Sequence, residues 1–222
     1  MARSTVLTAG PVAVADRLEA PLLHRALRPP VAALLHRWFG LTTEGLEHLP
    51  SRGPFIIAAN HHNYLDGVVL SVAVPAPISF LVMPRVWRAT PLHPFFHRHL
   101  GSIPITLARP DVGALRRALE ALASGRIVGI FPEGPFSTRG RLEPGLPGVA
   151  LLALRSGVPV VPAGIQGTYE ALVERRFYIP RLHPLSVRFG PPLYFKNGAG
   201  PVRETRQSVT ARIMADIAVL LS

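Results

Sequence analysis

The chain has 222 residues, which is enough to bury one substantial hydrophobic core and predicts one domain or at most two. It has no cysteine, so a disulfide framework and thiol chemistry are excluded. The net charge of +11 favours anionic partners, and the 48% hydrophobic content matches a membrane surface better than it matches nucleic acid.

Residues 1–40 are expected to form an N-terminal amphipathic segment ahead of a second domain, 41–222. Apolar residues recur at intervals of three and four across 13–40, with arginine and histidine between them, and Pro29-Pro30 should divide this stretch into a pair of helices. Such a basic helix pair can lie in a membrane interface, or it can pack on its own domain. We see neither a secretory signal nor an apolar run of spanning length, so we expect no transmembrane span.

Beyond Gly53-Pro54, short apolar runs alternate with amphipathic segments. Strands are predicted at 55–59, 78–83, 101–106, 127–131, 159–165 and 186–190, and helices at 64–73, 111–124, 146–156 and 203–221. The alternation predicts an α/β fold with a largely parallel, mixed sheet flanked by helices. Ligands of such sheets collect beyond the carboxyl ends of the strands.

His61 and Asp66 follow the first of these strands. An imidazole can take a proton from a hydroxyl near neutral pH, and a nearby carboxylate can fix its tautomer. Asn63 is placed to cap the next helix, with Asp66 at the third helical position. On a continuous helix His62 would share a face with Asp66, so His61 can be the base only if the backbone turns at this junction. A solvated loop histidine beside a helix-capping aspartate is the alternative.

A second loop, 132–141, follows the strand at 127–131. Its glycines and small hydroxyl residues suit a loop whose backbone N–H groups approach an oxyanion or a phosphate. Glu133 can accept hydrogen bonds from sugar or glycerol hydroxyls, and Arg139 and Arg141 can pair with phosphate. An ordinary surface loop could have the same composition.

Taken in order, these motifs resemble the glycerolipid acyltransferases, and especially the 1-acylglycerol-3-phosphate acyltransferase family. The family's N-H-x-x-x-x-D block matches Asn60-His61 through Asp66. Its F-P-E-G-T-R-S block matches Phe131 to Gly134 together with Ser137, and two further blocks match 101–109 and 158–163. The likeness covers about residues 40–190, and four blocks in the family's order are far more specific than any one of them.

The resemblance implies a glycerol-3-phosphate acyltransferase-like fold and transfer of a fatty acyl group from acyl-CoA or acyl carrier protein to the hydroxyl of lysophosphatidate. His61 would be the base and Asp66 would orient it, without an acyl-enzyme, a cofactor or a metal. The implied substrate-binding residues are Asn60, Arg109, Glu133, Gly134, Ser137, Arg139 and Arg141. Such an enzyme would lie peripherally on the cytoplasmic face of an anionic membrane, with no nucleic-acid partner.

The acceptor is the point at which the chain departs from the family. Where the third block has Thr-Arg, this chain has Pro135-Phe136, and that arginine binds phosphate in the family. Arg139 or Arg141 could replace it. Alternatively, the acceptor is a non-phosphorylated lysolipid such as an amino lipid or a glycolipid, or the chain is a catalytically silent lipid-binding relative.

An acyl chain requires an apolar groove in any of the enzymatic readings. One set of candidates follows Asp66 and consists of Val68, Val69, Leu70 and Val72. A second set lies in and just after the predicted strand at 78–83 and consists of Leu81, Val82, Met83, Val86 and Trp87. Simple core packing is the alternative for most of these residues.

Overall fold

The computed structural model describes residues 20–51, 53–106, 111–172, 180–195 and 205–222. Arg109 and the part of the predicted N-terminal segment at 1–19 lie outside these residues. Within the described ranges, no helix combines the length and the apolar character that crossing a membrane would require.

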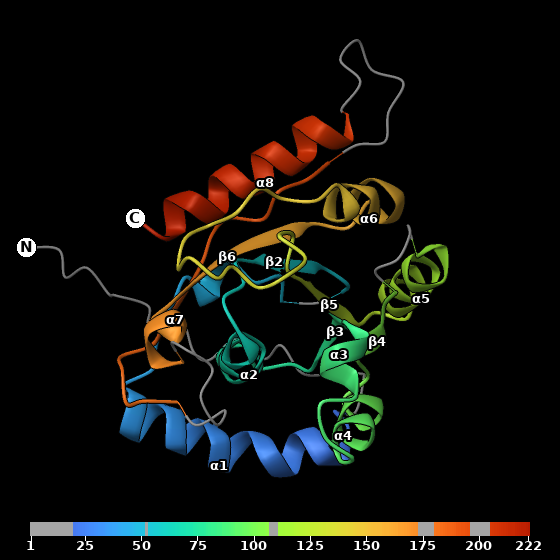
Figure 1. The fold of residues 1–222 in the computed structure, drawn as a ribbon. Coiled ribbons are helices and arrows are strands. Elements are labelled where there is room, and N and C mark those ends of the chain that lie inside the picture. The colour runs from blue at the N-terminus through green and yellow to red at the C-terminus, as the bar shows by residue number, and fades with distance from the viewer. Residues whose placement is uncertain (1–19, 52, 107–110, 173–179, 196–204) are drawn as a thin grey trace, which may run out of the picture.

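A seven-stranded sheet forms the centre of the molecule (Figure 1). Its strands are β1 (Thr42–Glu44), β2 (Ile56–Ala59), β3 (Ile78–Val82), β4 (Ile103–Pro104), β5 (Ile127–Ile130), β6 (Val160–Gln166) and β7 (Ser186–Phe189), in the order β1-β7-β6-β2-β5-β3-β4. Only the β6–β7 pair is antiparallel. The predicted α/β class with a largely parallel, mixed sheet is therefore confirmed.

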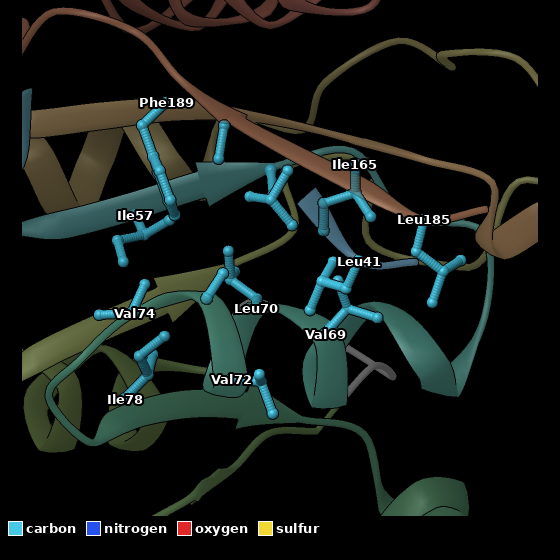
Figure 2. Packing of buried hydrophobic residues seen from close by; sticks show 14 of the residues in the cluster. Leu41, Ile57, Val69, Leu70, Val72, Val74, Ile78, Ile165, Leu185 and Phe189 are labelled. Atoms are coloured by element: carbon cyan, nitrogen blue, oxygen red, sulfur yellow. The ribbon is translucent and has the colours of Figure 1, made fainter. Parts of the chain in front are cut away.

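The central strands are apolar along their whole length because both faces of the sheet are covered. All four residues of β2 are fully buried. On one face lie α2 (Tyr64–Ala73) and, beyond it, α1 (Leu22–Phe39), so that α2 is enclosed between α1 and the sheet (Figure 1). Figure 2 shows Val69, Leu70 and Val72 of α2 in this core, which also contains Ile57 and Phe189.

The other face of the sheet is covered by three longer helices. These are α5 (Val112–Ala123), α6 (Gly148–Ser156) and α8 (Arg206–Leu220), which share a second apolar cluster with β2 and β5. Shorter helices are η1 (Leu46–His48), α3 (Pro84–Trp87), α4 (His93–His99) and α7 (Thr168–Ala171). The short helices and β1 were not predicted from the sequence, and the predicted strand at 101–106 is reduced to Ile103–Pro104.

The prediction that Pro29-Pro30 divides the N-terminal helix is wrong. Helix α1 runs without a break from Leu22 to Phe39 and contains both prolines. The prolines and the residues one turn before them, Arg25 and Ala26, are all exposed, so carbonyls that lose a helical partner can bond to water. The end of the helix is held by the burial of Leu35 and Phe39 against the core.

Candidate active site

The loop between β2 and α2 is shaped by a single carboxylate oxygen. Asp66 Oδ2 accepts hydrogen bonds from His61 Nδ1 at 2.8 Å, from the backbone N–H of His62 at 2.6 Å and from that of Asn63 at 2.8 Å. The Asn63 side chain accepts from the backbone N–H of Leu65, which completes a capping box at the start of α2. The backbone thus makes the turn that brings His61, rather than the His62 ring, onto Asp66.

This geometry decides which nitrogen of His61 is basic. Because the carboxylate oxygen accepts, the 2.8 Å contact assigns a proton to Nδ1 and leaves Nε2 with the free lone pair. The His61 side chain is only 10% exposed, and Asp66 is fully buried. The arrangement is that of an oriented general base.

Aromatic rings hold the plane of the His61 imidazole. The Phe131 ring stacks on it at a centroid distance of 3.8 Å and an interplanar angle of 6°, and Phe80 stacks in turn on Phe131 at 5.9 Å. The Phe136 ring meets His61 with an edge contact at 4.5 Å and also meets Tyr64 at 4.8 Å. Phe136, at the position where the resemblance implies a phosphate-binding arginine, is thus an aromatic wall beside the base.

Glu133 lies behind His61 and binds protein amides. Its Oε1 accepts from the backbone N–H of His61 at 2.7 Å, and its Oε2 accepts from the backbone N–H of Glu143 at 2.7 Å. Burial raises the pKa of this carboxyl from its ordinary 4.5 to about 7, although both N–H groups favour the ionised form. Glu133 is only 4% exposed and braces the His61 backbone, and its contact with a substrate hydroxyl stays a prediction.

Asn60 and Ser137 are also turned into the protein. The Asn60 side chain is fully buried and exchanges two hydrogen bonds with the backbone of Ile165 in β6, at 2.9 and 2.7 Å. Ser137 is 3% exposed; its N–H donates to the His61 carbonyl at 2.8 Å and its Oγ donates to the Arg141 carbonyl at 2.7 Å. Both side chains thus bond to backbone groups of the protein, and their contact with substrate stays a prediction.

Three more of the predicted binding residues are described by the structure. One of them lines the cavity of His61, and the other two do not. Gly134 lines the same cavity as His61, and its φ of +79° together with a would-be Cβ 2.6 Å from Leu146 requires glycine. Arg139 is exposed beside a separate, smaller depression of the second loop. Arg141 is 64% exposed and lies 3.8 Å from Glu143. Neither arginine lines the cavity of His61.

His61 lines an apolar cavity of about 550 Å³. The cavity extends from the start of α6 past the carboxyl ends of β5 and β3 to α1, and the predicted groove residues Val68, Val72, Leu81, Val82, Met83 and Val86 line it. Val69 and Leu70 belong to the hydrophobic core instead, which agrees with the alternative of simple core packing for these two residues. The size is within the range of small-molecule sites.

His62 is a buried neutral histidine rather than a second base. Burial lowers its pKa, and the negative charge of Asp66 opposes the shift only in part. Neither ring nitrogen has a hydrogen-bond partner among the described residues, and the ring packs against Tyr169. In the described ranges, no three histidine, aspartate or glutamate side chains are grouped so that they could hold a metal ion.

Comparison with known proteins identifies the family of this chain. The family model described as Acyltransferase matches residues 40–166, and the chain belongs to that family. A chloroplastic 1-acyl-sn-glycerol-3-phosphate acyltransferase of Brassica napus is 29% identical over 161 residues, which cover 69% of this chain and 45% of the relative. A protein of the same name from Bacillus subtilis is 26% identical over 129 residues, which cover 58% of this chain and 63% of the relative.

The fold is also that of a solved relative. The crystal structure of the 1-acyl-sn-glycerophosphate acyltransferase PlsC from Thermotoga maritima matches with a TM-score of 0.70 and 22% identity, over 87% of this chain and 78% of that one. The chain spans less than two thirds of the length of the Brassica and Bacillus relatives.

Proposed function

We propose that the chain transfers a fatty acyl group from a thioester, acyl-CoA or acyl carrier protein, to the hydroxyl of lysophosphatidate. The observation that carries the proposal is the His61–Asp66 hydrogen bond at 2.8 Å in the wall of a long apolar cavity. The names of the Brassica and Bacillus relatives support lysophosphatidate as the acceptor.

The geometry suits direct acyl transfer. His61 Nε2 would remove the proton of the acceptor hydroxyl while the oxygen of that hydroxyl attacks the thioester carbonyl. Asp66 would stabilise the imidazolium that forms on His61. As the C–O bond forms and the C–S bond breaks, the proton passes to the thiolate that leaves. A positioned base of this kind contributes on the order of a hundred- to ten-thousandfold in rate.

A second acceptor class is favoured by Phe136. Its ring touches the His61 ring, so the space beside the base is apolar where a phosphate-binding group would be useful. A non-phosphorylated lysolipid, such as an amino lipid or a glycolipid, would place no phosphate against this wall.

We further propose that the protein works peripherally on the cytoplasmic face of an anionic membrane. Helix α1 exposes Leu22, Leu34 and Trp38, and α4 exposes Phe95, between basic side chains. Apolar and basic groups side by side suit the membrane–water interface.

The test is thiol release from acyl-CoA by the purified protein, with lysophosphatidate or a monoacylglycerol of the same chain as acceptor. His61→Ala should lower the rate at least about a hundredfold, whereas His62→Ala, which removes a ring without hydrogen bonds, should keep most of the activity. Activity that survives in His61→Ala and is lost in His62→Ala would overturn the assignment of the base. A preference for monoacylglycerol would select the second acceptor class.

A further inference from the structure

The end of the apolar cavity at α1 carries an arginine that forms no ion pair with any described residue. Arg28 is half-buried and lines the cavity, and one of its terminal nitrogens donates to the Val72 carbonyl at 2.8 Å. Its Nε is buried with no hydrogen-bond partner in the described part of the chain. None of the ion pairs between described residues includes Arg28. A guanidinium has five N–H donors, and the bond to Val72 uses one of them.

Other polar groups at this end are also available to a ligand. His24 precedes Arg28 by one helical turn, lines the same cavity, and has an Nε2 that is buried without a partner among the described residues. His93 and His97 of α4 line the cavity as well, with ring centroids 5.8 Å apart. No described aspartate or glutamate lines it. The α1 end is therefore cationic and donor-rich, while the walls between it and His61 are mostly apolar.

Capping of α2 explains only part of this arrangement. Val72 lies in the last turn of α2, where a carbonyl without a partner inside the helix and the helix dipole both favour a cation. That contact uses one donor of a side chain with five, and a buried N–H without an acceptor is unfavourable. An anion that accepts from the remaining donors would remove this cost.

The α1 end is too far from the base to hold the phosphate of the acceptor. From Tyr64 to Val72 the rise of α2 alone is about 12 Å, at about 1.5 Å per residue. In lysophosphatidate the reacting hydroxyl and the phosphate are only a few bonds apart. A ligand group at Arg28 must therefore be separated from a group at His61 by an extended chain.

We propose that the α1 end of the cavity binds the anionic head, carboxylate or phosphate, of a single-chain amphiphile whose tail extends along the apolar walls toward His61. Arg28 would supply charge-assisted hydrogen bonds to the head, and His24 would supply a further polar contact. The proposal depends on the cavity and not on the acyl-transfer reaction, because the ligand needs no reactive group.

The test measures binding of decanoate, decyl phosphate and decanol to the purified full chain without any acyl donor. Wild-type protein should bind at least one of the anions about tenfold or more tightly than decanol, since the three differ only in the head group. The relative affinities of decanoate and decyl phosphate then distinguish a carboxylate site from a phosphate site. Equal affinity for all three ligands overturns the proposal, whatever the variants do.

Three variants locate the site. Arg28→Gln keeps a donor for the Val72 carbonyl and should lose the preference for anions. Arg25→Gln removes the same charge from an exposed position three residues earlier and should keep the preference. His61→Ala should also keep it, because the head lies at the other end of the cavity. A preference that persists in Arg28→Gln, or that disappears in His61→Ala, contradicts the proposed position.

Discussion

At the scale of single residues, the site depends on carboxylates that accept backbone N–H groups. Asp66 Oδ2 bonds to His61 Nδ1 and to two backbone amides, so the same atom shapes the loop and orients the base. Glu133 holds the His61 backbone by accepting its N–H. A change at either carboxylate therefore moves the imidazole as well as the local charge, and small displacements of a catalytic group are costly in rate.

Glu133→Gln should change how the stability of the protein depends on pH. In the folded protein the pKa of Glu133 is about 7, above its ordinary 4.5, so between these values the folded state binds a proton that the unfolded state has lost. The contribution of Glu133 to stability is thus fully present below about pH 4.5 and is lost as pH rises through about 7. Denaturant unfolding at several pH values should show wild-type stability falling across this range relative to Glu133→Gln.

The same variant should also lower turnover. An amide can accept only through its carbonyl oxygen, so Glu133→Gln gives up one of the two backbone contacts. We expect kcat to fall about tenfold or more with a nearly unchanged KM, because both carboxylate oxygens of Glu133 already accept from protein N–H groups. Parallel pH profiles of stability for the two proteins, or an increase in KM alone, would contradict the role of a positioning residue.

At the scale of elements, α1 shows how packing can override a helix-breaking signal. Pro29 and Pro30 remove two backbone donors, yet the helix continues because their side is exposed and Leu35 and Phe39 fix the following turns to the core. The prolines are thus a local cost that tertiary contacts offset.

Replacing both prolines with alanine should stabilise the protein. Proline costs about 3 kcal/mol relative to alanine inside a helix, but here the carbonyls one turn earlier are exposed and can bond to water, and the alanine variant has a more flexible unfolded chain. The double substitution should therefore raise the free energy of unfolding by only about 1–3 kcal/mol. Thermal or denaturant unfolding measures the change. Leu35→Ala, which truncates a buried side chain of the same helix, should lower the free energy of unfolding. A loss of stability in the proline variant would show that the two prolines fit α1 without an energetic cost.

At the scale of the whole molecule, the two faces of the sheet have different surroundings. Helices α1 and α2 cover the face on which His61 and the apolar cavity lie, and α8 covers the other (Figure 1). The exposed Trp38 and Phe95 belong to α1 and α4, so the apolar surface lies over the elements that line the cavity. A membrane on this side would put lipid close to the site.

Phe95→Ser should weaken binding to vesicles that contain anionic lipid. The ring is 51% exposed on α4, and its loss removes apolar contact with the bilayer interface. Val219→Ser is a matched control, because Val219 is 69% exposed on α8. Vesicle sedimentation at low and high salt should show weaker binding for Phe95→Ser only and a decrease with salt for all three proteins. Equal loss in both variants would exclude α4 as the contact.

The sequence by itself determined the sheet class and the helix at 64–73, because these depend on local apolar runs and capping residues. Its spacing left both His61 and His62 as possible partners of Asp66, and the backbone turn ahead of α2 selected His61. Distant contacts were decided only by the tertiary structure. Asn60 and Glu133 are polar residues at a motif, but their partners, Ile165 and the backbone of Glu143, are set by the pairing of strands and the path of a loop. Arg28 reaches the cavity because α1 packs across α2, an arrangement that depends on buried area rather than on any pattern within α1.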